Sequence, residues 1–554
     1  MKQFPSNDDF DWAIYSTISS NGFRRILTSY KNIIRNPRLV IALDIGSAYS
    51  GYAWQYRDEF EDRRDAHFNI NWGTGALQKC CDGIKVEDQL GQQLPLFDVM
   101  TLFIRELIKH FKNKIKTKLD KTIDENTTLF VVTVPAIWSN SAKEFMRKAT
   151  IAAGAGENNV LLALEPEAAA ISCMHLTSQQ KEDMNNFGDV GHKFLVADLG
   201  GGTADLLAVE VEKGGKLKEL HQCRGDNIGG QNINEAFRQL CHDSFKGDKW
   251  QKMFRDLSPA DIVEMEATFE NAKVQIGSGD SDSEMIPFKI PDEIRKGLDT
   301  RAITLKTGSI VHYNDKTFSF KSAVVREQLF KTTCHMLYDA IKNVLNREEA
   351  KGIKTVILVG GFSESPIVTG TLRKNVKVDF PGVKVVVPDS PFKSVLLGAV
   401  LYGHDPMIFN SRISRETYGV KSNVDFDETK HDASKKWRNE ETGVFKCKDI
   451  FDIHVKKGQS VSLLEPQPKQ VYNPAYQDQK SVSLPIYSSS NINPQYTTDE
   501  GCKQIGIVEV EMSDTTGGRD RKVEVSMSYG GTQIAVLAKD VTTGKTVNAK
   551  IVFG

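Results

Sequence analysis

Two segments far apart in the chain carry nearly the same pattern, and this duplication restricts the folds that the sequence can adopt. Each segment is an apolar run that ends in Asp, followed by a turn of small residues and a second apolar run; they span 41–54 and 195–211. The pattern predicts two β-hairpins with buried strands and tight turns. Glycine in such turns lets backbone amides approach a polyphosphate closely.

The acids that end the first strands of these hairpins are Asp44 and Asp198. A buried carboxylate without a partner is costly, so both side chains need a cation. Mg²⁺ bridged to phosphates is the natural one, because it prefers oxygen ligands and keeps part of its water shell. The duplication therefore predicts two similar lobes that face one nucleotide across a cleft.

Composition narrows the class of protein further. The 554 residues are enough for several domains, and 71 Lys and Arg side chains balance 72 Asp and Glu side chains, so charge does not indicate a nucleic-acid partner. No apolar run reaches the ~18–20 residues of a membrane span, and residues 1–11 lack the order of a secretory signal. The 8 cysteines form no C-x-x-C pair, which indicates a reduced, cytoplasmic setting.

The chain divides into three parts by its periodicity. Helical spacing occurs at 94–119, 141–153, 233–245, 259–276 and 325–345, and buried-strand runs occur at 129–134, 160–164 and 355–359. After His404, short alternating strands separated by Gly, Asn, Asp and Ser replace the helices. We therefore predict a helical appendage at 1–36, an α/β nucleotide-binding domain at 37–405 and a β-rich domain at 406–554.

Five motifs, taken together and in order, resemble the ATPase domain of the 70-kDa heat-shock protein family. They are DIGSAYS at 44–50, VPAIW at 134–138, LEPEAAA at 164–170, DLGGGTAD at 198–205 and VGGFS at 359–363. Further details are similar to the divergent subfamily 12 of that family. The resemblance covers nearly everything after about residue 37. It implies an α/β, two-lobed actin-like ATPase fold with duplicated ribonuclease-H-like lobes, followed by a small, mostly-β C-terminal domain.

The resemblance also implies roles for individual residues, with ATP or ADP and Mg²⁺ as the cofactors. Asp44 and Asp198 would hold the metal, mainly through water, and Glu165 and Asp205 would complete the catalytic set. Phosphate contacts are implied for Gly46, Ser47, Gly200, Gly201, Gly202, Thr203, Gly229 and Gly230. Nucleoside contacts are implied for Glu270, Lys273, Gly360, Gly361, Ser363 and Asp389. Two alternatives stay open: Glu165 as a helix-terminal charge favoured by the dipole, and Gly229-Gly230 as an ordinary loop.

Two departures from the family pattern affect the expected activity. Typical members stack two arginines on adenine, where this chain carries Val274 and Glu364, so we expect weaker ATP affinity or looser base selectivity. Members also carry a lysine aimed at the γ-phosphate, but the segment after residue 57 is short, and neither Lys79 nor Lys85 is singled out by its neighbours. Because phosphoryl transfer depends on charge neutralisation, we expect weak ATP hydrolysis at most.

The C-terminal part is similar to a peptide-binding β-domain without its helical lid. Within it, Gly544-Lys545-Thr546 imitates the end of a phosphate-binding loop, but Lys539 stands where that loop needs glycine and strand-like runs flank the tripeptide. We interpret it as a hairpin turn. Cys80 and Cys81 lack partners at ligand spacing, so we interpret them as free thiols.

Three functions remain open on sequence alone. The favoured one is an atypical heat-shock-70-like protein that binds Mg-ATP in the interlobe cleft and contacts unidentified protein clients or partners. The second is a nucleotide-stabilised scaffold without turnover. The third is a sugar-kinase-like member of the same superfamily, although we find no sugar-binding insert with a catalytic Asp.

Overall fold

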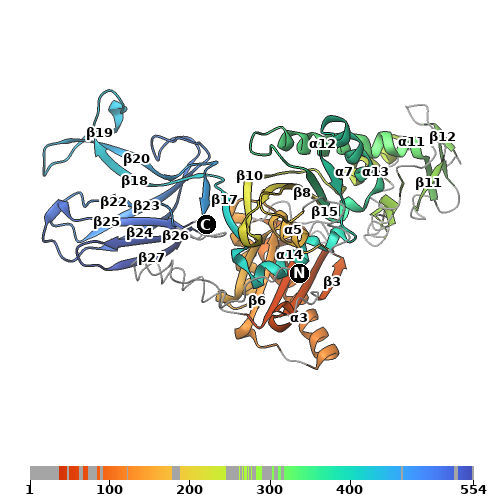
Figure 1. The fold of residues 1–554 in the computed structure, drawn as a ribbon, viewed down its shortest axis with the longest axis horizontal. Helices are drawn as coiled ribbons and strands as arrows, with labels where there is room; N and C mark the ends of the chain where they lie inside the picture. Colours follow the sequence, from red (N-terminus) through yellow and green to blue (C-terminus); the bar gives the residue numbers. More distant parts are fainter. Residues whose placement is uncertain are drawn as a thin grey trace.

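The computed structural model is a mixed α/β protein with several sheets (Figure 1). It describes residues 37–45, 49–61, 67–72, 84–87, 92–120, 123–176, 187–244, 284–289, 302–304, 310–313, 317–462, 466–528 and 534–551, with isolated positions between 252 and 282. The appendage expected at 1–36 lies outside the described residues. Among the described residues, no helix has the length and apolar character needed to cross a membrane.

The first hairpin belongs to a five-stranded sheet. In spatial order its strands are β3 (His67–Trp72), β2 (Tyr49–Tyr56), β1 (Leu39–Ile45), β6 (Thr128–Val134) and β7 (Val160–Leu164). β1 and β2 are antiparallel, whereas β6 and β7 continue the sheet in parallel. The hairpin predicted from the first apolar repeat is therefore confirmed.

The second hairpin lies at the middle of a seven-stranded sheet. In spatial order its strands are β16 (Lys384–Val386), β15 (Thr355–Val359), β8 (Lys193–Leu199), β9 (Ala204–Val211), β10 (Leu217–Asp226), β17 (Phe409–Ile413) and β21 (Ser460–Ser462). β8 and β9 are antiparallel, and β15 runs parallel to β8. This arrangement confirms the second predicted hairpin.

Two helices, α5 (Glu165–Met174) and α14 (Ser394–His404), share one apolar core with both sheets. Side chains alternate along each strand, so Val40 and Ala42 of β1 and Phe194 and Val196 of β8 all face this shared core. The two helices approach closely because small residues line their contact. A Cβ on Gly398 of α14 would overlap backbone atoms of α5.

Further helices cover the outer faces of the two sheets. α3 (Leu96–Leu119) and α4 (Asn140–Ala152) pack on the first sheet; α7 (Gly230–Ser244), α12 (Lys331–Leu345) and α13 (Pro366–Asp379) pack on the second. The helix predicted at 325–345 is α-helical only from Lys331, because a short α11 (Ser322–Val324) is followed by a π-helical turn, η6 (Val325–Phe330). Smaller sheets complete this region: β11 (Met285–Lys289), β14 (Thr317–Lys321), β13 (Ile310–Tyr313) and β12 (Ala302–Thr304), and the pair β4 (Lys85–Glu87) and β5 (Gln93–Pro95).

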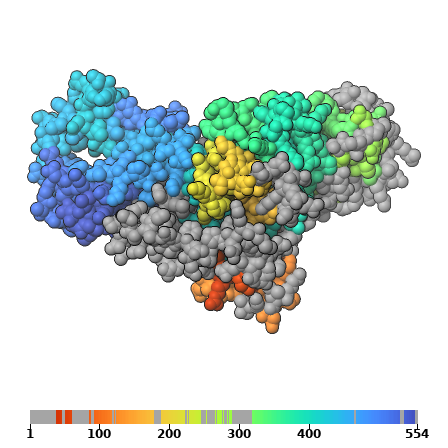
Figure 2. All heavy atoms as spheres, viewed as in Figure 1, coloured from red at the N-terminus to blue at the C-terminus, as the bar shows by residue number. Residues whose placement is uncertain are grey.

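Most of the chain after residue 413 forms two antiparallel sheets around their own apolar core. The first contains β19 (Lys436–Arg438), β20 (Phe445–Val455), β18 (Thr417–Asp425), β23 (Ser481–Ser489) and β24 (Cys502–Glu511). The second contains β22 (Gln470–Tyr472), β25 (Val523–Ser528), β26 (Ile534–Asp540) and β27 (Thr546–Ile551). These strands gather at one end of the molecule in Figure 2, coloured in blues.

The connection between the two regions is itself part of the structure. β17 pairs in parallel with β10, and β21 pairs with β17, so both strands extend the seven-stranded sheet. Arg412 of β17 makes two hydrogen bonds to the carboxylate of Glu167 in α5, at 2.7 and 2.5 Å, and both side chains are largely buried. Removing either partner would leave a buried charge uncompensated.

The close contact of α5 and α14 gives a direct test of the fold. We expect Gly398→Ala to lower the free energy of unfolding by about 1–3 kcal/mol, because the added methyl group must displace the Ala168 backbone. Gly382→Ala is the matched control: nothing lies within 4 Å of its Cβ, so we expect a change within about 1 kcal/mol. Urea unfolding measures both, and equal effects would refute the tight crossing.

Candidate functional site

The hairpin acids lie on the strand faces that point to α5. Asp44 follows Ala42 at the spacing of two residues that keeps side chains on one face, and Asp198 follows Val196 in the same way. Asp205 of β9 is opposite Asp198 in the register of the second hairpin. Glu165 is the first residue of α5, which packs between the sheets. The structure thus brings together the four predicted catalytic acids.

Electrostatic coupling shows that these carboxylates are close neighbours. Burial raises the pKa of Glu165 well above its ordinary value, and the charges of Asp44, Asp198 and Asp205 raise it further. Burial likewise raises the pKa of Asp198, with contributions from Asp205 and Asp44. Like charges in a site of low solvation disfavour ionisation of each other, so the cluster needs positive charge.

The surroundings of two of the acids differ. Burial raises the pKa of Asp44, while a hydrogen bond lowers it: the Thr133 hydroxyl donates to the Asp44 carboxylate at 2.7 Å. Burial raises the pKa of Asp205 to about 6, against the lowering influence of Arg415 and Lys143. Within the described part of the chain, Oδ1 of Asp205 is buried and has no hydrogen-bond partner. It is therefore an acceptor available to a ligand or water.

This donor set suits a hydrated divalent cation. Among the described residues, no three His, Cys, Asp or Glu side chains converge closely enough to form a direct metal cage. Mg²⁺ keeps several waters and commonly binds through one or two carboxylates together with phosphates. Asp44 and Asp198, one from each sheet, could hold such an ion through its water shell.

A tight turn and a helix terminus form the adjoining side of the site. The Gly200 amide donates to the Thr203 carbonyl at 2.9 Å and closes the turn of the second hairpin. The first amides of α7 dock on it: Gly230 donates to Gly200 at 3.1 Å and Gln231 to Gly201 at 2.7 Å. A helix N-terminus next to a glycine turn favours anions.

Two further glycines are required by close packing at this turn. A Cβ on Gly229 would lie 2.5 Å from the Gly201 carbonyl oxygen. Gly360 has φ +82°, and a Cβ there would lie 2.5 Å from Oδ1 of Asp198. Gly229-Gly230 is therefore not an ordinary loop, since it packs on the hairpin turn. Gly46 and Ser47 lie outside the described residues.

Next to the glycine turn, Glu270 and Lys273, two of the predicted nucleoside contacts, take part in a largely buried hydrogen-bond network. Lys273 Nζ lies 2.6 Å from the Glu270 carboxylate and donates to the Gly230 carbonyl at 3.1 Å and to Asn234 at 3.0 Å. Asn234 in turn donates to Glu270 at 2.6 Å. Burial lowers the pKa of Lys273, and Glu270 raises it. The ammonium group also lies over the Phe362 ring, 5.8 Å from its centroid.

The turn after β15 carries the remaining predicted nucleoside contacts. It is η7 (Gly361–Glu364), and the Gly360 amide donates to the Pro391 carbonyl of the neighbouring η8 (Pro391–Lys393) at 3.0 Å. Ser363 is buried and its hydroxyl donates to the Val359 carbonyl at 2.5 Å, so this hydroxyl is already engaged within the turn. Glu364 and Asp389 are exposed, and Val274 lies outside the described residues.

The sequence did not predict two cationic side chains, Arg415 and Lys143, that lie near Asp205. Arg415 Nη1 and Lys143 Nζ both donate to the Ala136 carbonyl, the latter at 3.2 Å. The Ala136 amide hydrogen-bonds the Asp205 carboxylate. No local pattern could have revealed this group, because its members come from three distant segments. Thr133 and Phe362 were also missed, although both lie beside or within quoted motifs.

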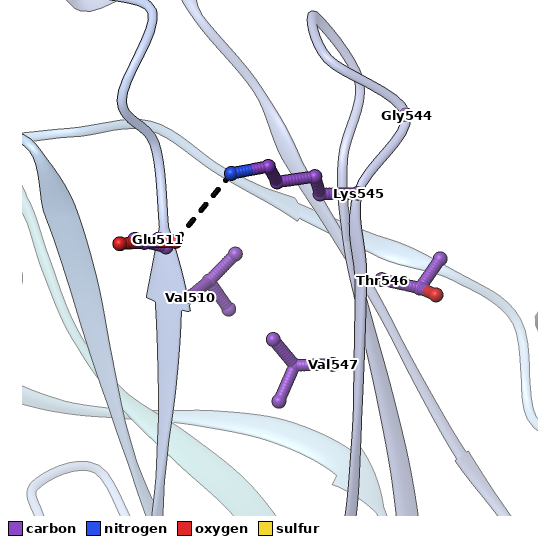
Figure 3. A pocket seen from close by; sticks show the side chains of 6 residues that line it. All are labelled: Val510, Glu511, Gly544, Lys545, Thr546 and Val547. Atoms are coloured by element: carbon purple, nitrogen blue, oxygen red, sulfur yellow. Dashed lines mark hydrogen bonds and ion pairs between the residues drawn. The ribbon is translucent and has the colours of Figure 1, made fainter.

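Two expectations about lysines and loops can be compared with the structure. Gly544 and Lys545 form a hairpin turn between β26 and β27, as predicted, and Gly544 has φ +72°. They line a pocket at the edges of β24 and β27, where Lys545 Nζ lies 3.5 Å from Glu511 (Figure 3). Lys85 is an exposed residue of β4. Lys79, Cys80 and Cys81 lie outside the described residues.

Comparison with known proteins identifies the family. The family model described as Hsp70 protein matches residues 100–404, more than half of the chain. The chain therefore belongs to the Hsp70 family, whose members bind nucleotides. It is 29% identical over 527 residues to heat shock 70 kDa protein 12B of Homo sapiens, covering 84% of this chain and 76% of that protein. Heat shock 70 kDa protein 12A of Homo sapiens and of Mus musculus are each 27% identical over 522 residues, with the same coverage. The resemblance to subfamily 12 is thus confirmed.

The raised pKa of Asp205 predicts how the ligand-free protein responds to pH. Its folded pKa of about 6 exceeds the unfolded value of ~3.9, so stability falls as pH rises through this interval. We expect Asp205→Asn to raise the free energy of unfolding at pH 7 by about 2–3 kcal/mol and to have little effect below pH ~4.

Urea unfolding without nucleotide or magnesium measures this difference. The matched control is Asp478→Asn, which changes an exposed residue away from the cluster and should leave the free energy of unfolding nearly unchanged at both pH values. An Asp205→Asn effect of equal size at pH 4 and pH 7 would show that ionisation is not its cause.

Proposed function

We propose that the chain binds Mg-ATP or Mg-ADP in the cleft between two actin-like lobes, one built on each of the sheets with a hairpin acid. The observation that carries this proposal is a cluster of four acids, Asp198 and Asp205 buried and Asp44 and Glu165 half-buried, beside a turn of close-packed glycines; neighbouring carboxylates raise the pKa values of Glu165 and Asp198. Together they match the two charges of a metal–polyphosphate complex.

The residues divide the ligand between them in this proposal. Asp44 and Asp198 hold the hydrated cation, and the amides of Gly201, Gly202 and Thr203 in the hairpin turn bind phosphate oxygens, with the N-terminus of α7 adding a favourable dipole. Glu270 and Lys273 are positioned to hydrogen-bond the ribose hydroxyls. Glu165 and Asp205 orient water near the phosphates. When bound, Mg²⁺ would neutralise phosphate charge and polarise the terminal phosphoryl group.

Weak hydrolysis follows from where the cations near the acids are held. Arg415 and Lys143 both donate to the Ala136 carbonyl, so they are positioned against the protein backbone rather than along a phosphate chain. Charge stabilisation of the transferring phosphoryl group is the largest catalytic contribution in such reactions. We infer nucleotide binding with slow turnover.

The proposal assigns a second role, contact with other proteins, to the C-terminal β-sheets. We propose a nucleotide-binding domain over 37–405 and a β-rich domain over 406–554 that contacts client or partner proteins in a chaperone-like manner. Membership in the Hsp70 family and the two antiparallel sheets with their own core support this division. The buried Arg412–Glu167 pair ties the second domain to the helix that begins with Glu165.

Thermal unfolding with and without nucleotide tests the proposal. Mg-ATP at a hundred times its Kd should stabilise the folded chain by about 2.7 kcal/mol, seen as a higher Tm. Asp198→Asn should abolish this ligand-induced shift, whereas Asp478→Asn should keep it. Because Asp198→Asn also relieves repulsion in the empty site, the shift must be compared within each variant.

Phosphate release measured on the same samples separates the alternatives. Slow release that requires Asp198 supports a weak ATPase. Stabilisation without any release favours a nucleotide-stabilised scaffold, and release that requires an added sugar favours a kinase. No Tm shift with any Mg-nucleotide would contradict the proposed site.

A further inference from the structure

Thr133 lies on the strand between two segments that carry acids of the cluster. It is the penultimate residue of β6, and the neighbours of β6 in the sheet are β1 and β7. The register of β1 with β6 ends one residue before Asp44 and Thr133, so these two residues are next to each other across the sheet. On the other side, Thr133 is paired with Ala163 of β7, two residues before Glu165.

The hydroxyl of Thr133 is directed to the β1 side. Thr133 is buried, and its hydroxyl lies 2.7 Å from Oδ1 of Asp44 and 3.4 Å from the Leu43 carbonyl oxygen. A hydroxyl has one proton to donate, and the shorter contact shows that the carboxylate accepts it. Such a bond to an ionised carboxylate is stronger than one between neutral groups. One oxygen of Asp44 is therefore held against β6.

This use of a buried threonine hydroxyl differs from a purely local one. Thr150 is also buried, but its hydroxyl donates to the Met146 carbonyl at 2.8 Å inside α4, which satisfies it within its own helix. Thr133 instead bonds across two strands to an acid. Glu165 and Asp198 repel the charge of that acid. The bond therefore restrains a carboxylate that would otherwise turn to reduce this repulsion.

We propose that Thr133 is a positioning residue for the cation: its hydroxyl holds Oδ1 of Asp44, so that Oδ2 is the oxygen that meets the water shell of a Mg²⁺ ion. This inference rests on the proposed nucleotide site and adds a residue that acts on it through Asp44. Groups that hydrogen-bond a metal-binding carboxylate orient it, and their loss typically lowers metal affinity about 10–100-fold. Thr133 itself contacts neither the metal nor the phosphates.

Isothermal titration of the full chain with ADP, once with Mg²⁺ and once with EDTA, tests the inference. The Kd in EDTA divided by the Kd in Mg²⁺ measures what the cation adds to binding, and it does not depend on turnover. We expect Thr133→Val, which keeps the branched side chain but lacks the hydroxyl, to lower this ratio about tenfold. Thr133→Ser keeps the hydroxyl and should preserve the ratio. Thr133→Ala gives the same comparison should Thr133→Val not fold.

Two further variants separate the proposed role from a general loss of packing. Thr150→Val is the matched control, because it removes a buried hydroxyl that is bonded within α4, and it should leave the ratio unchanged. In an Asp44→Asn background, Thr133→Val should have no additional effect on the ratio, because the hydroxyl acts through that carboxylate. Urea unfolding of each variant without ligand shows that the folded state is retained.

The outcomes distinguish this inference from the proposed function. An unchanged ratio in the folded Thr133→Val chain, or an equal loss in Thr133→Ser, would overturn the inference and leave the proposed nucleotide site standing. If the unaltered chain binds ADP equally well with Mg²⁺ and with EDTA, the proposed cation fails together with the inference. If the unaltered chain binds no Mg-nucleotide, the proposed function fails as a whole.

Discussion

Four acids, two of them buried and two half-buried, lie close together where the two larger sheets meet α5, and burial and mutual repulsion disfavour their charged forms. Alternation along β1, β8 and β9 turns an aspartate from each strand toward the same layer, where α5 contributes Glu165. Burial raises the pKa of all four acids, and neighbouring carboxylates raise those of Glu165 and Asp198 further, so a cation beside them would favour their ionised forms. The stability of the fold therefore depends on pH through this one group of side chains.

The layer between the sheets makes this concentration of charge possible. α5 and α14 are lined with small residues, and their contact leaves no room for a Cβ at Gly398. Larger residues there would hold the sheets farther apart and separate Asp44 from Asp198. The same packing that brings two apolar cores together thus sets the distance between the acids that could share a metal ion.

Local patterns in the sequence were sufficient to predict the elements that carry the four acids. Apolar runs bounded by Asp and Gly located both hairpins, and helical periodicity located α3, α4 and α7 within a few residues. The Gly544 turn was also predicted, because flanking alternation excluded a helix after it. The grouping of the four acids was predicted only as an implication of the family resemblance.

Long-range contacts and side-chain directions could not be obtained in this way. Arg415 and Lys143 meet at Ala136 only through the tertiary fold, and neither belongs to a motif. Ser363 was correctly placed on its turn, yet its hydroxyl is directed to a backbone carbonyl, which depends on one rotamer. The π-helical turn before Lys331 was invisible because its apolar spacing resembles that of an α-helix.

The insertion of β17 beside β10 affects how the chain can be divided. A fragment that stops at α14 would lose β17, leave the start of β10 at Leu217 and Lys218 without its parallel neighbour and remove the guanidinium that compensates Glu167. The hydrophobic periodicity of the sequence changes from helical to alternating near residue 405. The hydrogen-bonded strands of the seven-stranded sheet, however, continue as far as Ser462. The shortest N-terminal fragment that preserves the seven-stranded sheet therefore ends after β21. That end point lies inside the β-rich domain that the sequence predicts at 406–554.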